Sequence, residues 1–145
     1  MHKNKGEAFP GVPLGRRMRA LKMWFVIREQ GVAGLMARIR RDLDQARWLE
    51  AQVRREPRWK ILAPVRLQTL VLRHEPPGLA GEALDVHTRA LADAINLSGE
   101  AYLTPAVIDG RWAIRVSLGG ANTEQEHVEA LWRLLRKQAA AAPVP

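Results

Sequence analysis

The chain has 145 residues, of which 47% are hydrophobic and 26% are charged, so it can form one folded domain with a core. It contains no cysteine, which excludes disulfides, a thiol nucleophile and thiolate metal sites. No apolar stretch approaches the ~20 residues of a membrane span and no signal peptide is evident, so we expect a cytoplasmic protein.

The N-terminal segment changes character at about residue 13. Residues 1–12 are polar and contain glycine and proline, which predicts a flexible leader. From Leu14 the sequence is typical of a helix, which Gly31 interrupts. Between Leu21 and Ile27 only Lys22 is polar, and a helix with so little polar surface should be covered on several sides. We expect it to face another domain, a second copy of the chain, or both; the alternative is a central helix of this domain's own core.

A second helix is predicted from Val32 to just before Pro57. Its apolar residues recur at steps of mostly three and four, which indicates one apolar stripe: Val32, Leu35, Met36, Ile39, Leu43, Ala46, Leu49 and Val53. Two strands follow, at Trp59–Leu62 and Leu67–Arg73. Residues 74–78 (His-Glu-Pro-Pro-Gly) then predict a loop.

The C-terminal half is predicted to contain a helix over Gly81–Leu97, two strands and a last helix. The strands, Ala101–Ile108 and Arg111–Leu118, are joined by Asp109-Gly110, which favours a type I′ hairpin. Thr123 and Glu126 are spaced as a capping box for the last helix, which should bury Val128, Leu131, Trp132 and Leu135.

This order of elements predicts one α+β domain over residues 13–138. Its antiparallel sheet of three or four strands should be covered on one face by helices. Residues 139–145 are rich in alanine and proline and are predicted to form a disordered tail.

The sequence also resembles a known family over about Pro13–Leu135. The similar segments are Pro13–Arg28, Gly31–Leu35, Arg66–His74, Tyr102–Ala106, Arg115–Ser117 and His127–Trp132. Together they resemble the C-terminal domain of group II pyridoxal-phosphate-dependent amino-acid decarboxylases, the aromatic-L-amino-acid decarboxylase family. A long collinear resemblance is far more specific than one short motif.

The resemblance implies the small domain of a fold-type-I enzyme. In that family a larger domain holds pyridoxal 5′-phosphate on a lysine, and the active site lies at a homodimer interface. The partners implied are therefore a large cofactor-binding domain, a second subunit and, in the completed enzyme, an amino-acid substrate. This would explain the apolar segment Leu21–Ile27, which would pack against the large domain.

Two residues are candidates for substrate binding in a completed enzyme. By the resemblance, Gly15 faces the substrate side chain, where a small residue leaves room for an aromatic ring; alternatively it allows a tight turn into the helix. Arg115 matches the family's strand arginine, and in fold-type-I enzymes a small-domain arginine often holds the substrate carboxylate. Its alternative role is an ion pair at the domain interface.

No residue is assigned to catalysis, to cofactor binding or to a metal. The family's cofactor lysine follows a histidine and precedes a tryptophan, whereas His2-Lys3 is followed by Asn4 and lies too close to Pro13. The four histidines are placed on separate predicted elements without metal-ligand spacing. We therefore expect the C-terminal part of an aromatic-type decarboxylase, a lyase, that lacks the cofactor lysine, binds no cofactor and is inactive alone.

Two other functions stay open. The solitary domain could be retained as a dimerisation or interaction module without catalysis. The formal net charge of +8 also allows a nucleic-acid-binding domain, although Asp42, Asp44 and Glu50 interrupt the arginines of the long helix. A dedicated duplex-binding helix would show a cleaner basic stripe.

Overall fold

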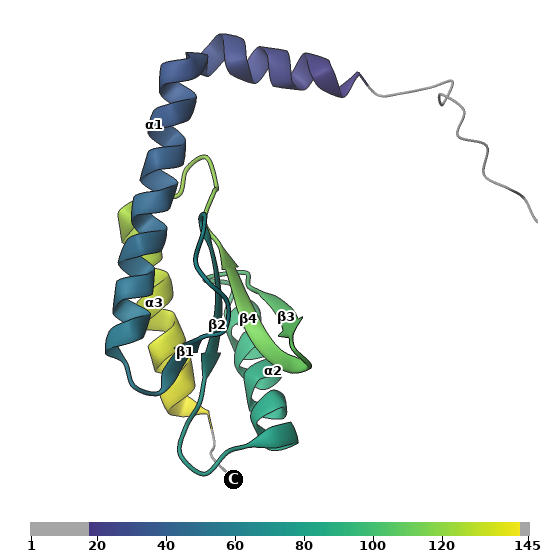
Figure 1. Cartoon of the computed structure of the whole chain (residues 1–145), viewed down its shortest axis with the longest axis vertical. Helices are drawn as coiled ribbons and strands as arrows, with labels where there is room; N and C mark the ends of the chain where they lie inside the picture. The colour runs from purple at the N-terminus through teal and green to yellow at the C-terminus, as the bar shows by residue number, and fades with distance from the viewer. Residues whose placement is uncertain (1–17, 143–145) are drawn as a thin grey trace, which may run out of the picture. The chain divides into compact units, whose positions relative to one another are not determined.

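A computed structural model describes residues 18–142, which form three helices and four strands (Figure 1). In chain order they are α1 (Arg19–Arg55), β1 (Trp59–Ile61), β2 (Thr69–His74), α2 (Gly81–Leu97), β3 (Thr104–Ile108), β4 (Arg111–Ser117) and α3 (Gln125–Ala141). The chain divides into two units between Leu35 and Met36. None of the helices described is long and apolar enough to cross a membrane.

The described part of the first unit is the N-terminal portion of α1. Gly31 has a φ of 66° and a ψ of 172°, values that only glycine adopts readily, and the helix kinks there. The predicted interruption at Gly31 is thereby confirmed. Trp24 and Phe25 are 53% and 57% exposed, with their ring centroids 5.1 Å apart, so this apolar segment has large side chains on its surface.

The second unit is built on a four-stranded antiparallel sheet with the order β1-β2-β4-β3. The β3–β4 hairpin turns at Asp109 and Gly110, whose φ angles are 50° and 73°. A type I′ turn needs positive φ at both central residues, so the predicted hairpin is confirmed. The predicted α+β class and the antiparallel sheet are confirmed as well.

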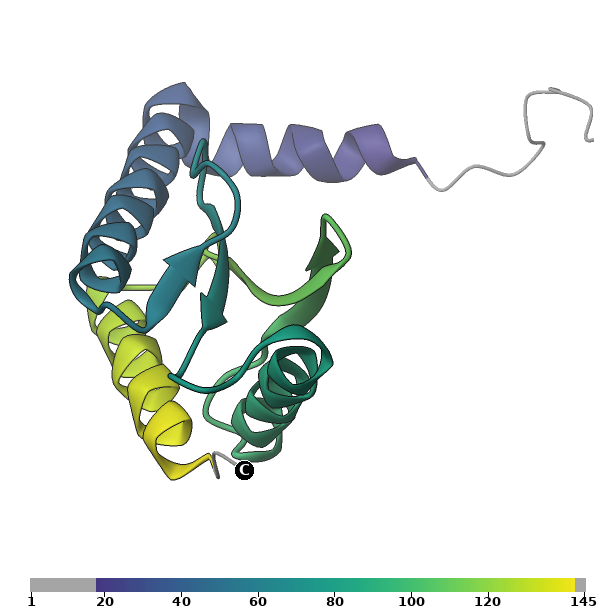
Figure 2. The same ribbon diagram turned by 60° about the horizontal axis from the view of Figure 1, so that its bottom comes forward.

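One face of the sheet carries the core. Leu70 and Leu72 of β2 lie opposite Val116 and Ile114 of β4, and all four are at most 1% exposed. Because alternate residues of a strand point to the same face, these four share one side. The core cluster that contains them also contains buried residues of all three helices: Ala46, Leu49, Val53, Leu91, Ala92, Ile95, Val128, Trp132, Leu134, Leu135 and Ala139. In Figure 2, α2 and α3 lie beside one another on this side.

The predicted apolar stripe of the long helix is buried only toward its C-terminal end. Ala46, Leu49 and Val53 belong to the core, whereas Met36 and Ile39 are 45% and 53% exposed. The periodicity identified the correct helix face. It could not show how much of that face the rest of the domain covers.

Several predicted boundaries differ from the structure. β2 includes His74, which was predicted to begin a loop, and it starts at Thr69. β3 starts at Thr104 instead of Ala101, because the Asn96 side chain occupies both backbone groups of Leu103. The Leu103 N–H donates to Asn96 Oδ1 over 2.7 Å, and Asn96 Nδ2 donates to the Leu103 carbonyl over 2.9 Å.

The last helix differs from its prediction at both ends. Its N-cap is Glu124, whose N–H donates to His127 Nδ1 over 2.9 Å, so the expected box of Thr123 and Glu126 was placed one residue too early. The helix continues to Ala141, and Ala139 is 8% exposed. Three residues of the predicted tail are thus helical, because burial of Ala139 favours another turn. The leader 1–12 and residues 143–145 lie outside the described residues, and the domain limits 13–138 stay a prediction.

Candidate functional site

The second face of the sheet carries Arg115, the predicted substrate-binding arginine. It lies opposite Val71 of β2 and Thr104 of β3, and by strand alternation it points away from the core face. The helix residues of the core pack on the opposite side, so the helices of this unit leave the face around Arg115 uncovered. The arginine is exposed.

Arg115 forms no ion pair with the carboxylates of residues 18–142, whereas Arg111 on the same face lies 3.9 Å from Asp109. A planar guanidinium on an open sheet can take a carboxylate through two parallel hydrogen bonds. The arrangement can therefore bind an anionic group that another protein segment or a substrate supplies.

A second arginine of the sheet, Arg73, has a structural role. It is 6% exposed, and its Nε and Nη2 donate to Glu75 Oε1 over 2.9 and 2.7 Å. Asp85 of α2 lies 3.8 Å from its guanidinium and accepts the Trp112 N–H over 3.0 Å. Because Arg73 is paired in this way, it ties β2 to α2 and is not available to a ligand.

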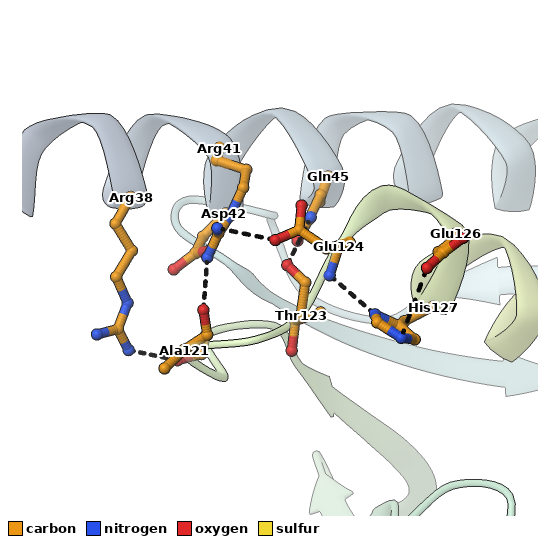
Figure 3. Close-up of polar contacts among 10 residues, drawn as sticks. Arg38, Arg41, Asp42, Gln45, Ala121, Thr123, Glu124, Glu126 and His127 are labelled. Atoms are coloured by element: carbon orange, nitrogen blue, oxygen red, sulfur yellow. Dashed lines mark hydrogen bonds and ion pairs between the residues drawn. The ribbon is translucent and has the colours of Figure 1, made fainter. Parts of the chain in front are cut away.

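The polar face of α1 holds the loop that precedes α3 (Figure 3). Arg38, Arg41 and Gln45 donate hydrogen bonds to the backbone carbonyls of Gly119, Ala121 and Thr123 over 3.0, 3.2 and 3.0 Å, respectively. Arg41 also lies 3.3 Å from Glu124 and 3.5 Å from the buried carboxylate of Asp42. These side chains fix the loop, so Arg38 and Arg41 already have protein partners and are not available to a nucleic acid.

Other arginines of α1 are paired along the helix. Arg47 lies 2.8 Å from Asp44, and Arg54 lies 2.6 Å from Glu50. Such i,i+3 and i,i+4 pairs are common on solvated helix faces. They offer no support for a dedicated nucleic-acid interface on this helix.

Two histidines that the sequence analysis treated separately form a buried pair. His74 Nδ1 of β2 lies 3.0 Å from His87 Nε2 of α2, and each residue is 6% exposed. Burial, followed by the charges of His87 and Arg58, lowers the pKa of His74 to about 4. Burial also lowers the pKa of His87. Both rings are therefore neutral at pH 7. The N–H of one ring donates a hydrogen bond to the unprotonated nitrogen of the other.

The part of the chain that the structure describes supplies no third metal ligand to the histidine pair. Within residues 18–142, no three histidine or carboxylate side chains come together in a way that could hold a metal ion. The pair was not predicted from the sequence, because 13 residues separate its members. The available signal was that His87 falls between Leu84 and Leu91 on the inner face of the predicted helix.

Comparison with known proteins relates this fold and sequence to a family of enzymes. The conserved domain of pyridoxal-dependent decarboxylases matches residues 7–74. Tryptophan decarboxylase TDC1 of Camptotheca acuminata is 35% identical over 129 residues, which cover 88% of this chain and 26% of that protein. The structure of Oryza sativa TDC with PLP and tryptamine superposes with a TM-score of 0.82 at 32% identity, over 90% of this chain and 28% of that one.

The chain belongs to the pyridoxal-dependent decarboxylase family.

The predicted resemblance to group II decarboxylases is thus confirmed, and the chain spans about a quarter of the length of the curated relatives it matches. Not all of these relatives are named as decarboxylases. The 4-hydroxyphenylacetaldehyde synthase of Rhodiola rosea is 36% identical over 132 residues, which cover 88% of this chain and 26% of that protein. Membership of the family therefore does not by itself define the reaction of this chain, although pyridoxal is the cofactor in the family's name.

The described residues do not fit the family's cofactor. A pyridoxal phosphate site needs a lysine for covalent attachment and an acid to hold the ring nitrogen protonated. Lys22, Lys60 and Lys137 are all exposed, so none of them offers a sheltered amine. Lys3 and Lys5 lie outside the described residues, as does Gly15, the other predicted substrate-binding residue.

Proposed function

We propose that this chain is the C-terminal part of a pyridoxal-phosphate-dependent, aromatic-type L-amino-acid decarboxylase, and that it has no activity alone. The supporting observation is the agreement with Oryza sativa TDC, at a TM-score of 0.82 over 90% of this chain but only 28% of that one. The residues that bind the cofactor would belong to the remainder of such an enzyme, outside these 145 residues. A cytoplasmic location stays a prediction.

In the completed enzyme, the role proposed for Arg115 is to bind the substrate carboxylate. Its exposure on the open face of the sheet supports this role, as does the absence of an ion pair with any carboxylate of residues 18–142. An ion pair with the large domain would use the same geometry and remains the alternative. Gly15 would leave space for an aromatic side chain.

The proposed partners are a large cofactor-binding domain and a second subunit. The apolar side chains of the first unit support this proposal. Met23, Trp24 and Phe25 are 67%, 53% and 57% exposed, and exposed apolar surface of this kind marks interaction sites. The same side chains support the second candidate function, a dimerisation or interaction module without catalysis.

The first experiment tests the chain by itself. Purified protein is mixed with pyridoxal phosphate and with L-tryptophan, L-tyrosine or L-phenylalanine, and release of CO₂ and the visible absorbance of the cofactor are followed. We expect neither turnover nor a stoichiometric band of a lysine-bound cofactor. Turnover of any of these amino acids by the chain alone would overturn the proposal.

A second experiment separates an enzyme part from an interaction module. The chain is co-expressed with the cofactor-binding portion of a related tryptophan decarboxylase, and CO₂ release is measured after the two are purified together. Restored activity supports the enzyme part, whereas stable association without activity supports the module. Arg115→Gln should then raise KM for the amino acid at least about tenfold, because a charge-assisted pair is lost. Arg111→Gln, on the same face, is the matched control and should have little effect.

A further inference from the structure

A basic pocket lies between the start of β1 and the C-terminal half of α3. Its volume is about 430 Å³, and it is lined by Glu56, Arg58, Trp59, His74, Arg133, Arg136, Lys137, Ala139 and Ala140. Four of these side chains are cations and one is a carboxylate. All lie within the second unit, so the pocket does not depend on the placement of the N-terminal helix.

The sequence concentrates this charge through helical spacing. Arg133, Arg136 and Lys137 are three and four residues apart on α3, which places them on one face of the helix. Arg58 meets them from the turn before β1, where its carbonyl accepts the Glu75 N–H over 2.6 Å. The cations therefore come from two elements whose backbones are both fixed.

Only one of the four cations is neutralised by a neighbour in the pocket. Arg136 Nε lies 3.2 Å from Glu56 Oε1. The other three cations form no ion pair with the carboxylates of the described residues. All three are exposed and can therefore reach a ligand in the pocket: Arg58, Arg133 and Lys137. The positive field reaches into the protein, because Arg58 contributes to the lowered pKa of His74.

The inner wall of the pocket is formed by buried aromatic rings that pack against one another. Trp59 and His74 are 5% and 6% exposed, and their ring centroids lie 5.0 Å apart. Trp132 packs against Trp59 with centroids separated by 5.4 Å. Carbonyls of the last turn of α3 bring partial negative charge to this end, but about half a charge is small beside the positive charges of Arg58, Arg133 and Lys137.

We propose that this pocket binds a small oxyanion that carries two or more negative charges, either a phosphate monoester or a compact polycarboxylate. Guanidinium groups match the paired oxygens of both ligands, and a volume of 430 Å³ suits a small molecule. This pocket is separate from Arg115 on the open face of the sheet. Binding of an oxyanion here does not depend on whether the chain is part of a decarboxylase.

Binding is tested on the complete chain by calorimetry at constant ionic strength. Inorganic phosphate and citrate represent the two ligand sources, and sodium chloride is the control for screening. We expect saturable binding of phosphate, citrate or both, with the tighter ligand identifying the source. A local readout comes from the nuclear magnetic resonance of the His74 ring protons, which should shift with the same dissociation constant.

Two variants assign the binding to this pocket. Arg58→Gln together with Arg133→Gln should weaken binding at least about tenfold, since each removes a charge-assisted contact. Arg47→Gln together with Arg54→Gln is the matched control, because it removes the same charge from the exposed face of α1 and should leave the affinity unchanged. Equal affinity in both double variants, or no response beyond that of chloride, would overturn the proposal.

Discussion

Lowering the pH should destabilise the fold through His74. Its pKa is about 4 in the folded protein, below the ordinary 6.5, chiefly because the ring is buried. Between these values the unfolded chain binds a proton that the folded protein does not, so stability falls as the pH decreases from 6.5 to about 4. Linkage gives a loss of about 2 kcal/mol by pH 5 and about 3 kcal/mol near pH 4. His87 contributes in the same direction, because burial lowers its pKa too.

The measurement is urea unfolding followed by tryptophan fluorescence, at several values between about pH 7.5 and about pH 4.5. Wild type is compared with His74→Gln, which removes this titration while keeping a polar side chain near His87. The variant's overall stability can differ, so the slope against pH is the readout. If the two curves run parallel across this range, burial of a neutral His74 does not make the contribution described.

Three further substitutions test a core residue, a side-chain hydrogen bond and the hairpin turn. Ile114→Ala removes a fully buried side chain and should lower the free energy of unfolding by about 2–5 kcal/mol. The control is Val107→Ala, at a half-exposed site of β3, which should change it by less than about 1 kcal/mol. Urea titration distinguishes the two variants. Asn96→Ala should lower the free energy of unfolding by about 1–3 kcal/mol, because both backbone groups of Leu103 lose their partner. Asn122→Ala, at an exposed loop position, is the control. Equal effects of the two substitutions would contradict this role of Asn96. Gly110→Ala should cost about 1 kcal/mol in the same assay from positive φ alone, since no atom lies within 4 Å of the added Cβ; an unchanged midpoint would be inconsistent with the type I′ turn.

Local signals in the sequence predicted those elements whose causes are local. The expected helix over Gly81–Leu97 has the bounds that the structure shows, since the apolar spacing that predicts it lies within the segment. The turn at Asp109-Gly110 also depends on two adjacent residues. The family resemblance likewise rests on continuous stretches, and it indicated the fold class before any contact was known.

Features that depend on distant residues could not be predicted in this way. Leu103 is withdrawn from the sheet by a side chain of the preceding helix, and strand periodicity carries no trace of that competition. His74 and His87 become partners only when β2 packs against α2. For the candidate site, the sequence indicated that Arg115 lies on a strand. That the helices leave its face of the sheet uncovered follows only from their packing against the other face.

The sheet ends on one side with β3, which contains Pro105. Proline carries no N–H to offer to an incoming strand, and on the other side β1 has only three residues. Long, regular edges recruit further chains into growing aggregates, whereas short or proline-containing ones resist it. This domain is therefore protected against polymerising through its strands, so self-association at high concentration should depend on the apolar side chains of its first helix.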